Sequence, residues 1–121
     1  MVYKNTEFRE KMQKRTRDFS LNLIEVLSRF PKTIPNEILI KQTIRSGTSI
    51  GANYREACEA ESGKDFVHKI RICKKESKET LYWLELLIEI NPNFTNELTE
   101  LLREAKEFVK IFSSISTKFN S

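Results

Sequence analysis

Apolar residues recur along the chain at alternating steps of three and four, which is the period of an amphipathic α-helix. This pattern predicts four helices, at about residues 6–30, 36–60, 63–90 and 95–118. Pro31 ends the first helix, and Pro35 suits the first turn of the second because that turn does not use the missing N–H. Ser62 and Asp65 match an S-x-x-D capping box, which predicts where the third helix starts.

Each predicted helix has one apolar face, which we expect to form the core. Its members are, helix by helix, Phe8, Met12, Phe19, Leu23, Val26 and Phe30, widened by Leu21 and Leu27; Ile38, Ile44, Ile50 and Ala57; Phe66, Ile70, Cys73, Ser77, Leu81, Leu84 and Leu87; and Leu98, Leu101, Leu102, Ala105, Phe108, Val109, Phe112, Ile115 and Phe119. Residues 1–121 are therefore predicted to form a single all-α domain. The economical fold is an antiparallel up-and-down four-helix bundle. A three-helix core with a helix exchanged between subunits is the alternative.

The composition narrows the function classes. Three glycines in 121 residues argue against a Gly-rich phosphate loop, and one histidine with two cysteines leaves too few ligands for a metal site. No apolar run approaches the ~18 residues that a membrane span needs, and the first residues lack the apolar region of a secretory signal. We therefore expect a cytoplasmic protein with reduced thiols and with no metal, cofactor or membrane contact.

The net charge of +4 hides two separate basic segments. Residues 1–32 and residues 63–78 each carry +4, whereas the other segments are neutral or acidic. In the third helix the basic residues step by four, three, four and three along one line, which we name the basic ridge: Lys64, His68, Arg71, Lys75 and Lys78. A less regular group in the first helix, the first-helix cluster, consists of Lys11, Lys14, Arg15 and Arg17.

Both basic groups are candidates for a nucleic-acid interface, in which several cations neutralise phosphates and release counterions. No helix-turn-helix, zinc-finger or RNA-binding aromatic motif accompanies them, so such binding to RNA or DNA would be largely independent of sequence. Two other interpretations remain open. Charged helix surfaces are commonly no more than solvated faces, and a basic face can instead bind an acidic protein partner.

A second set of polar residues lies beside the predicted core faces of the second and third helices. We name it the polar layer: Arg45, Ser49, Asn53, Glu56, Glu76, Glu79 and Trp83. A guanidinium binds a carboxylate bidentately, so Arg45 is the expected partner of Glu79 or Glu76. We expect Asn53 to bond a neighbouring helix, and Gly47 and Gly51 to let two helices approach closely.

An enzymatic interpretation of these residues is weaker than a structural one. Glu76 and Glu79 could serve as an acid–base pair, but no nucleophile or phosphate loop accompanies them. A di-iron bundle requires an E-x-x-H motif on each of two helices, and His68 is the only histidine of the chain. We therefore expect a protein that is not an enzyme and has no small-molecule substrate, with Cys58 and Cys73 as packing groups.

Two segments together resemble a known bacterial family. Residues 45–57, RSGTSIGANYREA, look like an R-x-x-x-S-I-x-x-N-x-x-E motif, and residues 64–84 combine an acid-Phe opening at Asp65 and Phe66 with E-x-x-x-W-L from Glu79. These motifs are similar to those of the four-helix bundle family known as large-subunit rRNA intervening-sequence proteins, also labelled ribosomal protein-like. The resemblance covers essentially the whole chain.

The resemblance implies a left-handed bundle that assembles as a ring-like homopentamer. It also implies kinship with the accessory variability determinant of diversity-generating retroelements, a basic bundle that binds nucleic acid and a reverse transcriptase. The function expected from residues and resemblance together is a non-enzymatic oligomer that binds nucleic acid through its basic groups. The alternative is a scaffold for an acidic or reverse transcriptase-like protein partner.

Overall fold

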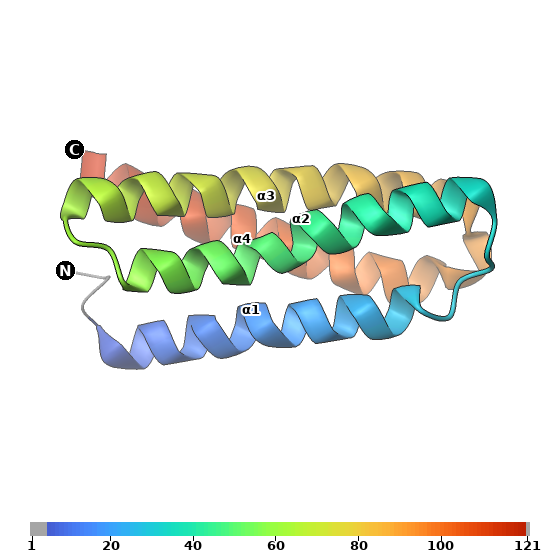
Figure 1. Ribbon diagram of the computed structural model, residues 1–121, viewed down its shortest axis with the longest axis horizontal. Coiled ribbons are helices and arrows are strands. Elements are labelled where there is room, and N and C mark those ends of the chain that lie inside the picture. The colour runs from blue at the N-terminus through green and yellow to red at the C-terminus, as the bar shows by residue number, and fades with distance from the viewer. Residues whose placement is uncertain (1–4, 121) are drawn as a thin grey trace.

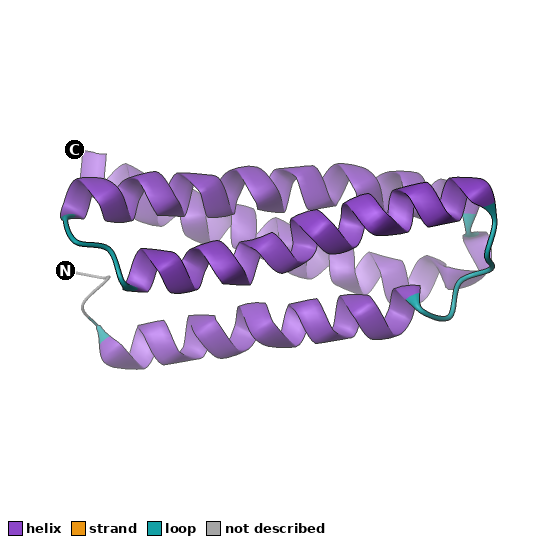
Figure 2. Ribbon diagram, in the orientation of Figure 1, coloured by secondary structure: helices purple, strands orange, loops and turns teal. Residues whose placement is uncertain are grey.

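The structure is a computed structural model that describes residues 5–120. These residues form four α-helices and a 3-10 turn, with no strand among them: α1 (Thr6–Leu27), α2 (Ile34–Cys58), α3 (Gly63–Ile90), η2 (Pro92–Phe94) and α4 (Thr95–Asn120). The helices lie side by side along one long axis (Figure 1). The α1–α2 connection and η2 lie at one end of the molecule, and the α2–α3 connection lies at the other (Figure 2). The all-helical prediction is thus confirmed.

Polar side chains cap the first turns of three helices. Asn5 Oδ1 accepts a hydrogen bond from the Phe8 N–H at 3.0 Å, and Thr33 Oγ1 accepts one from the Asn36 N–H at 3.2 Å. Ser62 Oγ accepts one from the Asp65 N–H at 3.0 Å, as the capping box predicts. Each cap satisfies one of the backbone donors that a helix start leaves unpaired.

The bounds of α3 are as expected, whereas one or both ends of each other helix differ from the expected ones by two or three residues. Residues 28–30 form a turn after α1, although the apolar pattern continues through the buried Phe30. The α2 helix begins at Ile34, two residues early, because Thr33 rather than a residue nearer Pro35 provides its cap. It ends at Cys58 instead of continuing to residue 60.

The core follows the predicted faces closely. Its fully buried apolar residues come from all four helices: Leu23, Ile50, Ile70, Cys73, Leu84, Leu87, Leu98, Ala105, Phe108 and Phe112. Two expected core residues are exposed instead: 49% of the surface of Leu21 and 58% of that of Ile38 is accessible. Tyr54, which was not among the expected core residues, is buried and packs near Phe112. Leu21 follows the buried Phe19 by two residues and Ile38 follows the buried Asn36 by two, so each lies on the side of its helix away from the buried face.

Close packing of α1 on α2 depends on two glycines. A Cβ atom on Gly47 would collide with the side chain of Leu23, and one on Gly51 would lie 3.1 Å from Thr16 Oγ1. The predicted close approach is therefore present, and its partner is α1. Since α1 packs mainly on α2, and α3 on α2 and α4, α1 and α3 occupy opposite corners of the bundle (Figure 1).

Candidate functional site

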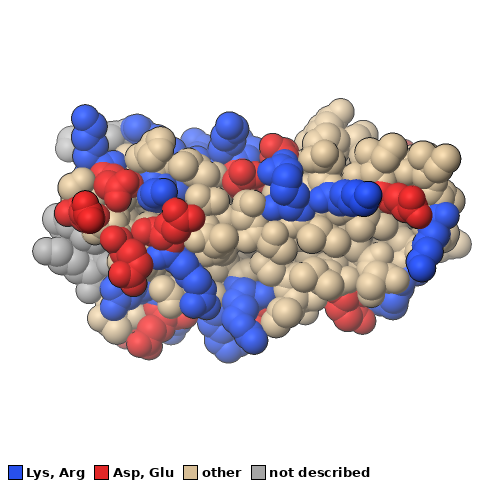
Figure 3. Space-filling model, viewed as in Figure 1, with Lys and Arg blue, Asp and Glu red and all other residues tan. Residues whose placement is uncertain are grey.

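The basic ridge lies on the side of α3 that faces away from the core. Its five residues Lys64, His68, Arg71, Lys75 and Lys78 are all exposed. None of the five forms an ion pair with an acidic side chain within residues 5–120. In Figure 3 blue side chains follow the upper edge of the molecule over the first half of α3. The ridge is thus a row of solvated basic residues, four of them charged at neutral pH, for which the described part of the chain provides no carboxylate partner.

The first-helix cluster is different because carboxylates of the chain neutralise it. Lys11 Nζ lies 3.1 Å from Glu7 Oε1, and Lys14 Nζ lies 2.6 Å from Asp18 Oδ2. The same Asp18 lies 3.9 Å from Arg17. These side chains are largely exposed, so each pair contributes only a few tenths of a kcal/mol to stability, roughly 0.3–0.5 for i,i+4 pairs. Their effect on the electrostatic potential is nevertheless to cancel most of the local positive charge.

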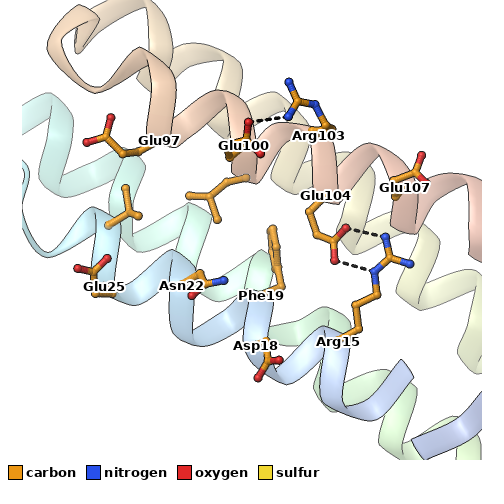
Figure 4. A pocket seen from close by; sticks show the side chains of 12 residues that line it. Arg15, Asp18, Phe19, Asn22, Glu25, Glu97, Glu100, Arg103, Glu104 and Glu107 are labelled. Atoms are coloured by element: carbon orange, nitrogen blue, oxygen red, sulfur yellow. Dashed lines mark hydrogen bonds and ion pairs between the residues drawn. The ribbon is translucent and has the colours of Figure 1, made fainter. Parts of the chain in front are cut away.

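Arg15, which we expected to belong to a binding surface, joins two helices instead. Its Nε and Nη2 atoms donate to the two carboxylate oxygens of Glu104 on α4, at 2.7 and 2.6 Å (Figure 4). The guanidinium also lies 5.5 Å from the centre of the Phe108 ring. Hydrogen bonding to the Glu104 carboxylate raises the pKa of Arg15 above its ordinary value. Glu104 therefore already accepts two of the hydrogen bonds that Arg15 could donate to a phosphate.

An open groove of about 610 Å³ follows the seam between α1 and α4 (Figure 4). Phe19, Val26 and Leu101 are the apolar residues that line it. Six carboxylates surround them, namely Asp18, Glu25, Glu97, Glu100, Glu104 and Glu107. Each of these carboxylates is paired with a Lys or Arg of the chain. The groove therefore combines an apolar lining with carboxylates that all have basic partners. Sequence reasoning did not find it because α1 and α4 are remote in sequence.

The polar layer brings Arg45 of α2 onto two carboxylates of α3, as predicted. Arg45 Nη2 forms an ion pair with Glu79, and its Nη1 lies 3.5 Å from Glu76 Oε1. Trp83 Nε1 donates to Glu79 Oε2 at 3.1 Å. Farther along the same helix pair, Lys69 Nζ lies 2.9 Å from Glu56 Oε1. That contact raises the pKa of Lys69.

The middle of the polar layer differs from the prediction. Asn53 Nδ2 donates to the Ser49 carbonyl at 2.8 Å, within α2, and does not bond a neighbouring helix as expected. Ser49 Oγ likewise donates to the Arg45 carbonyl at 2.7 Å. Both bonds have the four-residue spacing of a helix side chain that returns to its own backbone. Within the polar layer, the contacts of α2 with α3 are therefore made by Arg45 and Glu56, and not by Ser49 or Asn53.

Sequence reasoning missed two buried polar contacts between α2 and α3. Asn36 and Asn91 exchange amide hydrogen bonds of 3.0 and 2.8 Å where the two helices meet at one end of the bundle. Thr80 Oγ1 donates to Ser46 Oγ at 2.9 Å in the interior. Asn36 could be interpreted from the sequence as part of a helix start and Asn91 as a helix stop. That the two residues are close becomes clear only when the start of α2 is known to lie beside the end of α3.

The two cysteines do not form a reactive site. Cys73 is fully buried, and its Sγ lies 3.6 Å from the Ile50 carbonyl oxygen. Loss of solvation raises the pKa of the Cys73 thiol to about 12, so it stays protonated at neutral pH. Cys58 is half-buried. Within residues 5–120, no three potential metal ligands gather, and no helix is long and apolar enough to cross a membrane.

Among these features, the basic ridge alone presents several uncompensated charges in a regular array. Such an array can neutralise a row of phosphates but supplies no group that reads a base. The polar layer has two carboxylates close together, but Arg45 occupies both of them. These contacts join α2 to α3, and the buried Glu76 Oε1, although ion-paired with Arg45, accepts no hydrogen bond within residues 5–120.

Comparison with known proteins gives two findings. The model of the 23S rRNA-intervening sequence protein family matches residues 9–114. The crystal structure of a protein of unknown function, from the S23 ribosomal protein family of Bacteroides thetaiotaomicron VPI-5482, is similar with a TM-score of 0.81 and 33% sequence identity. That similarity covers 90% of this chain and 97% of the other. No curated protein matches the sequence.

Proposed function

The chain belongs to the 23S rRNA-intervening sequence protein family, and from this premise we propose that it is a non-enzymatic, homo-oligomeric helical bundle that binds the backbone of RNA or DNA in the cytoplasm. The observation that carries this proposal is the basic ridge. Its cations are exposed, evenly spaced and without carboxylate partners within residues 5–120, whereas every cation of the first-helix cluster has one.

The two basic groups contribute unequally to the proposed binding. A phosphate that approaches the first-helix cluster must compete with Glu7, Asp18 and Glu104 for the cations that these carboxylates already bind. The groups also lie on opposite corners of the bundle. One chain therefore offers one binding row, on α3, and the cluster adds at most a diffuse attraction.

The finer architecture belongs to the same proposal: an antiparallel up-and-down, left-handed bundle that assembles as a ring-like homopentamer. Short connections at alternate ends of the molecule support the up-and-down order (Figure 2). Assembly would concentrate the field, because five copies of a chain with net charge +4 carry about +20 in one particle. Fields of that size accelerate the encounter of oppositely charged partners.

Fluorescence anisotropy with labelled RNA and DNA oligonucleotides at 50 and 200 mM salt tests the proposal. Removing four ridge charges, with Lys64→Gln, Arg71→Gln, Lys75→Gln and Lys78→Gln, should weaken binding at least tenfold. It should also lower the slope of log K against log salt by roughly 3 to 4, since each phosphate contact contributes about 0.7–0.9.

A matched control removes the same number of charges elsewhere, with Lys11→Gln, Lys14→Gln, Arg17→Gln and Lys110→Gln. The control should keep most of the affinity because these cations are paired in the free protein. No binding at 50 mM salt, or equal losses in the two variants, would refute the ridge as the interface. A bound partner that survives nuclease treatment and is released by high salt would instead indicate an acidic protein.

A further inference from the structure

The basic ridge ends on an exposed aromatic side chain. Tyr82 follows Lys78 by four residues and so continues the same line along α3. Its surface is 54% accessible, so the ring is available to a ligand that follows the ridge. The phenol ring stands 5.1 Å from the indole of Trp83, measured between ring centres.

Trp83 fixes the position of this aromatic pair. Its indole N–H donates to Glu79, and Glu79 is itself held by Arg45 from the neighbouring helix. The indole is half-buried, and the exposed Tyr82 ring packs against it. Tyr82 is therefore an ordered aromatic surface at the end of a row of cations.

The spacing of this row suits one strand better than two. Successive ridge residues are three or four apart, so at 1.5 Å rise per residue their charges recur about every 5 Å in a single line. From Lys64 to Tyr82 the line is roughly 27 Å long. A duplex presents phosphates on two strands and keeps its bases stacked inside, where Tyr82 would have no exposed base face to contact.

The charge of α3 changes sign just beyond Tyr82. The next ionisable residues on α3 are Glu85 and Glu89, both exposed. A phosphate backbone that follows the ridge is therefore repelled after Tyr82 and must leave the helix there. A base of the strand at this point can stack on the Tyr82 ring.

We infer that the basic ridge binds single-stranded nucleic acid in preference to duplex, with Tyr82 stacking on a base where the strand leaves α3. This inference rests on the proposed function and adds the class of nucleic acid to it. A cationic row that follows the backbone, combined with an aromatic ring that accepts any base, is the general chemistry of sequence-independent single-strand binding.

The test compares labelled oligo(U), oligo(dT) and a duplex of equal length, at fixed salt, on the complete protein. Wild type should bind both single strands more tightly than the duplex. Tyr82→Ala should lose about 5- to 150-fold in single-strand affinity, the range measured for removal of one stacking ring, and keep its duplex affinity. Tyr82→Phe should bind like wild type because it retains the ring.

Two further measurements, the salt dependence of binding and the tryptophan fluorescence, distinguish base stacking from an effect of charge. The salt dependence of Tyr82→Ala should match wild type, since a stacked base releases no counterions. Trp83 is the only tryptophan of the chain, so its fluorescence should respond to oligo(dT) in wild type and less in Tyr82→Ala. Leu21→Ala, an exposed apolar change on α1, is the control and should leave binding unchanged.

The outcomes against the inference are distinct from those against the proposed function. Equal or tighter duplex binding by wild type would overturn the single-strand preference alone, as would a Tyr82→Phe variant as weak as Tyr82→Ala. A change of oligomeric state in Tyr82→Ala would identify Tyr82 as a subunit contact and would also overturn the inference. Failure of every probe to bind at 50 mM salt would overturn the proposed function itself.

Discussion

At the scale of single residues, the missing side chain of Gly47 determines how α1 and α2 meet. A glycine inside a helix costs about 1 kcal/mol relative to alanine, so its presence in the middle of α2 needs a structural reason. The buried Leu23 side chain of α1 occupies the space that a Cβ on Gly47 would take. Leu23 is surrounded by the core and has no free direction in which to move.

The Gly47→Ala variant should therefore be less stable than wild type. Overpacking of a filled core costs about 1–3 kcal/mol, and because Leu23 is fully buried we expect this cost to exceed the gain of about 1 kcal/mol in helix propensity. Urea unfolding followed by circular dichroism measures the change. Gly63→Ala is the matched control, because a Cβ there meets nothing within 4 Å, and it should be neutral or slightly stabilising. A Gly47→Ala protein as stable as this control would disprove the packing argument.

The Arg15–Glu104 pair is a second effect of single residues. Both oxygens of Glu104 receive a hydrogen bond from Arg15, but the two side chains are 38% and 30% exposed, so solvent weakens the pair. We expect Arg15→Gln to lower stability by about 1 kcal/mol or less and to leave nucleic-acid affinity nearly unchanged. A large loss of affinity with normal stability would return Arg15 to the binding surface.

At the scale of elements, polar contacts at several positions along the bundle axis connect α2 to α3 and so determine how the two helices align. The Ser46–Thr80 hydrogen bond is fully buried, and the Asn36–Asn91 pair is nearly so, with 3% and 6% of the residue surfaces accessible. Arg45 and Glu79 follow along the pair, and Glu56 with Lys69 lies nearer the other end. Buried polar pairs of this kind favour one register over the shifted alternatives.

Asn36→Ala should cost about 1–3 kcal/mol, because it leaves the buried Asn91 amide without one of its partners. Lys69→Ala, which removes an exposed ion pair between the same helices, should cost much less because solvent screens that pair. Chemical denaturation of both variants under the same conditions compares the two contacts. Equal costs would mean that burial does not distinguish them and that the asparagine pair has no special role.

The four helices and most of the core could be predicted from the sequence because both depend on the period of apolar residues within one segment. Contacts between segments were predictable only where a polar residue flanks the core face of each of two consecutive helices, as with Arg45 and Glu79. Arg15 and Glu104 are 89 residues apart, and no periodicity along α1 indicates that α4 faces it. Asn53 was mistaken for a contact between helices because its spacing also suits a bond to its own backbone.

At the scale of the whole molecule, the exposed aliphatic residues suggest where copies of the chain meet. Ile34 and Ile38 are 75% and 58% accessible, and Ile90 is 49% accessible. The Asn36–Asn91 hydrogen bonds place the start of α2 beside the end of α3, so these three residues share one end of the bundle. Single exposed aliphatic residues are common, but several at one location are typical of an interface.

The proposed pentamer can be tested by light scattering during size-exclusion chromatography. Wild type should have about five times the 14.3 kDa mass of the chain. The double variant Ile34→Lys, Ile38→Lys should dissociate into smaller species with unchanged helix content, because it places charges where apolar surface would be buried. Leu21→Lys, a change of similar exposure on α1, should retain the assembly. A wild-type protein that stays at 14.3 kDa at all concentrations would refute the pentamer, and the ridge of each chain would then have to bind nucleic acid without the avidity that several linked sites provide.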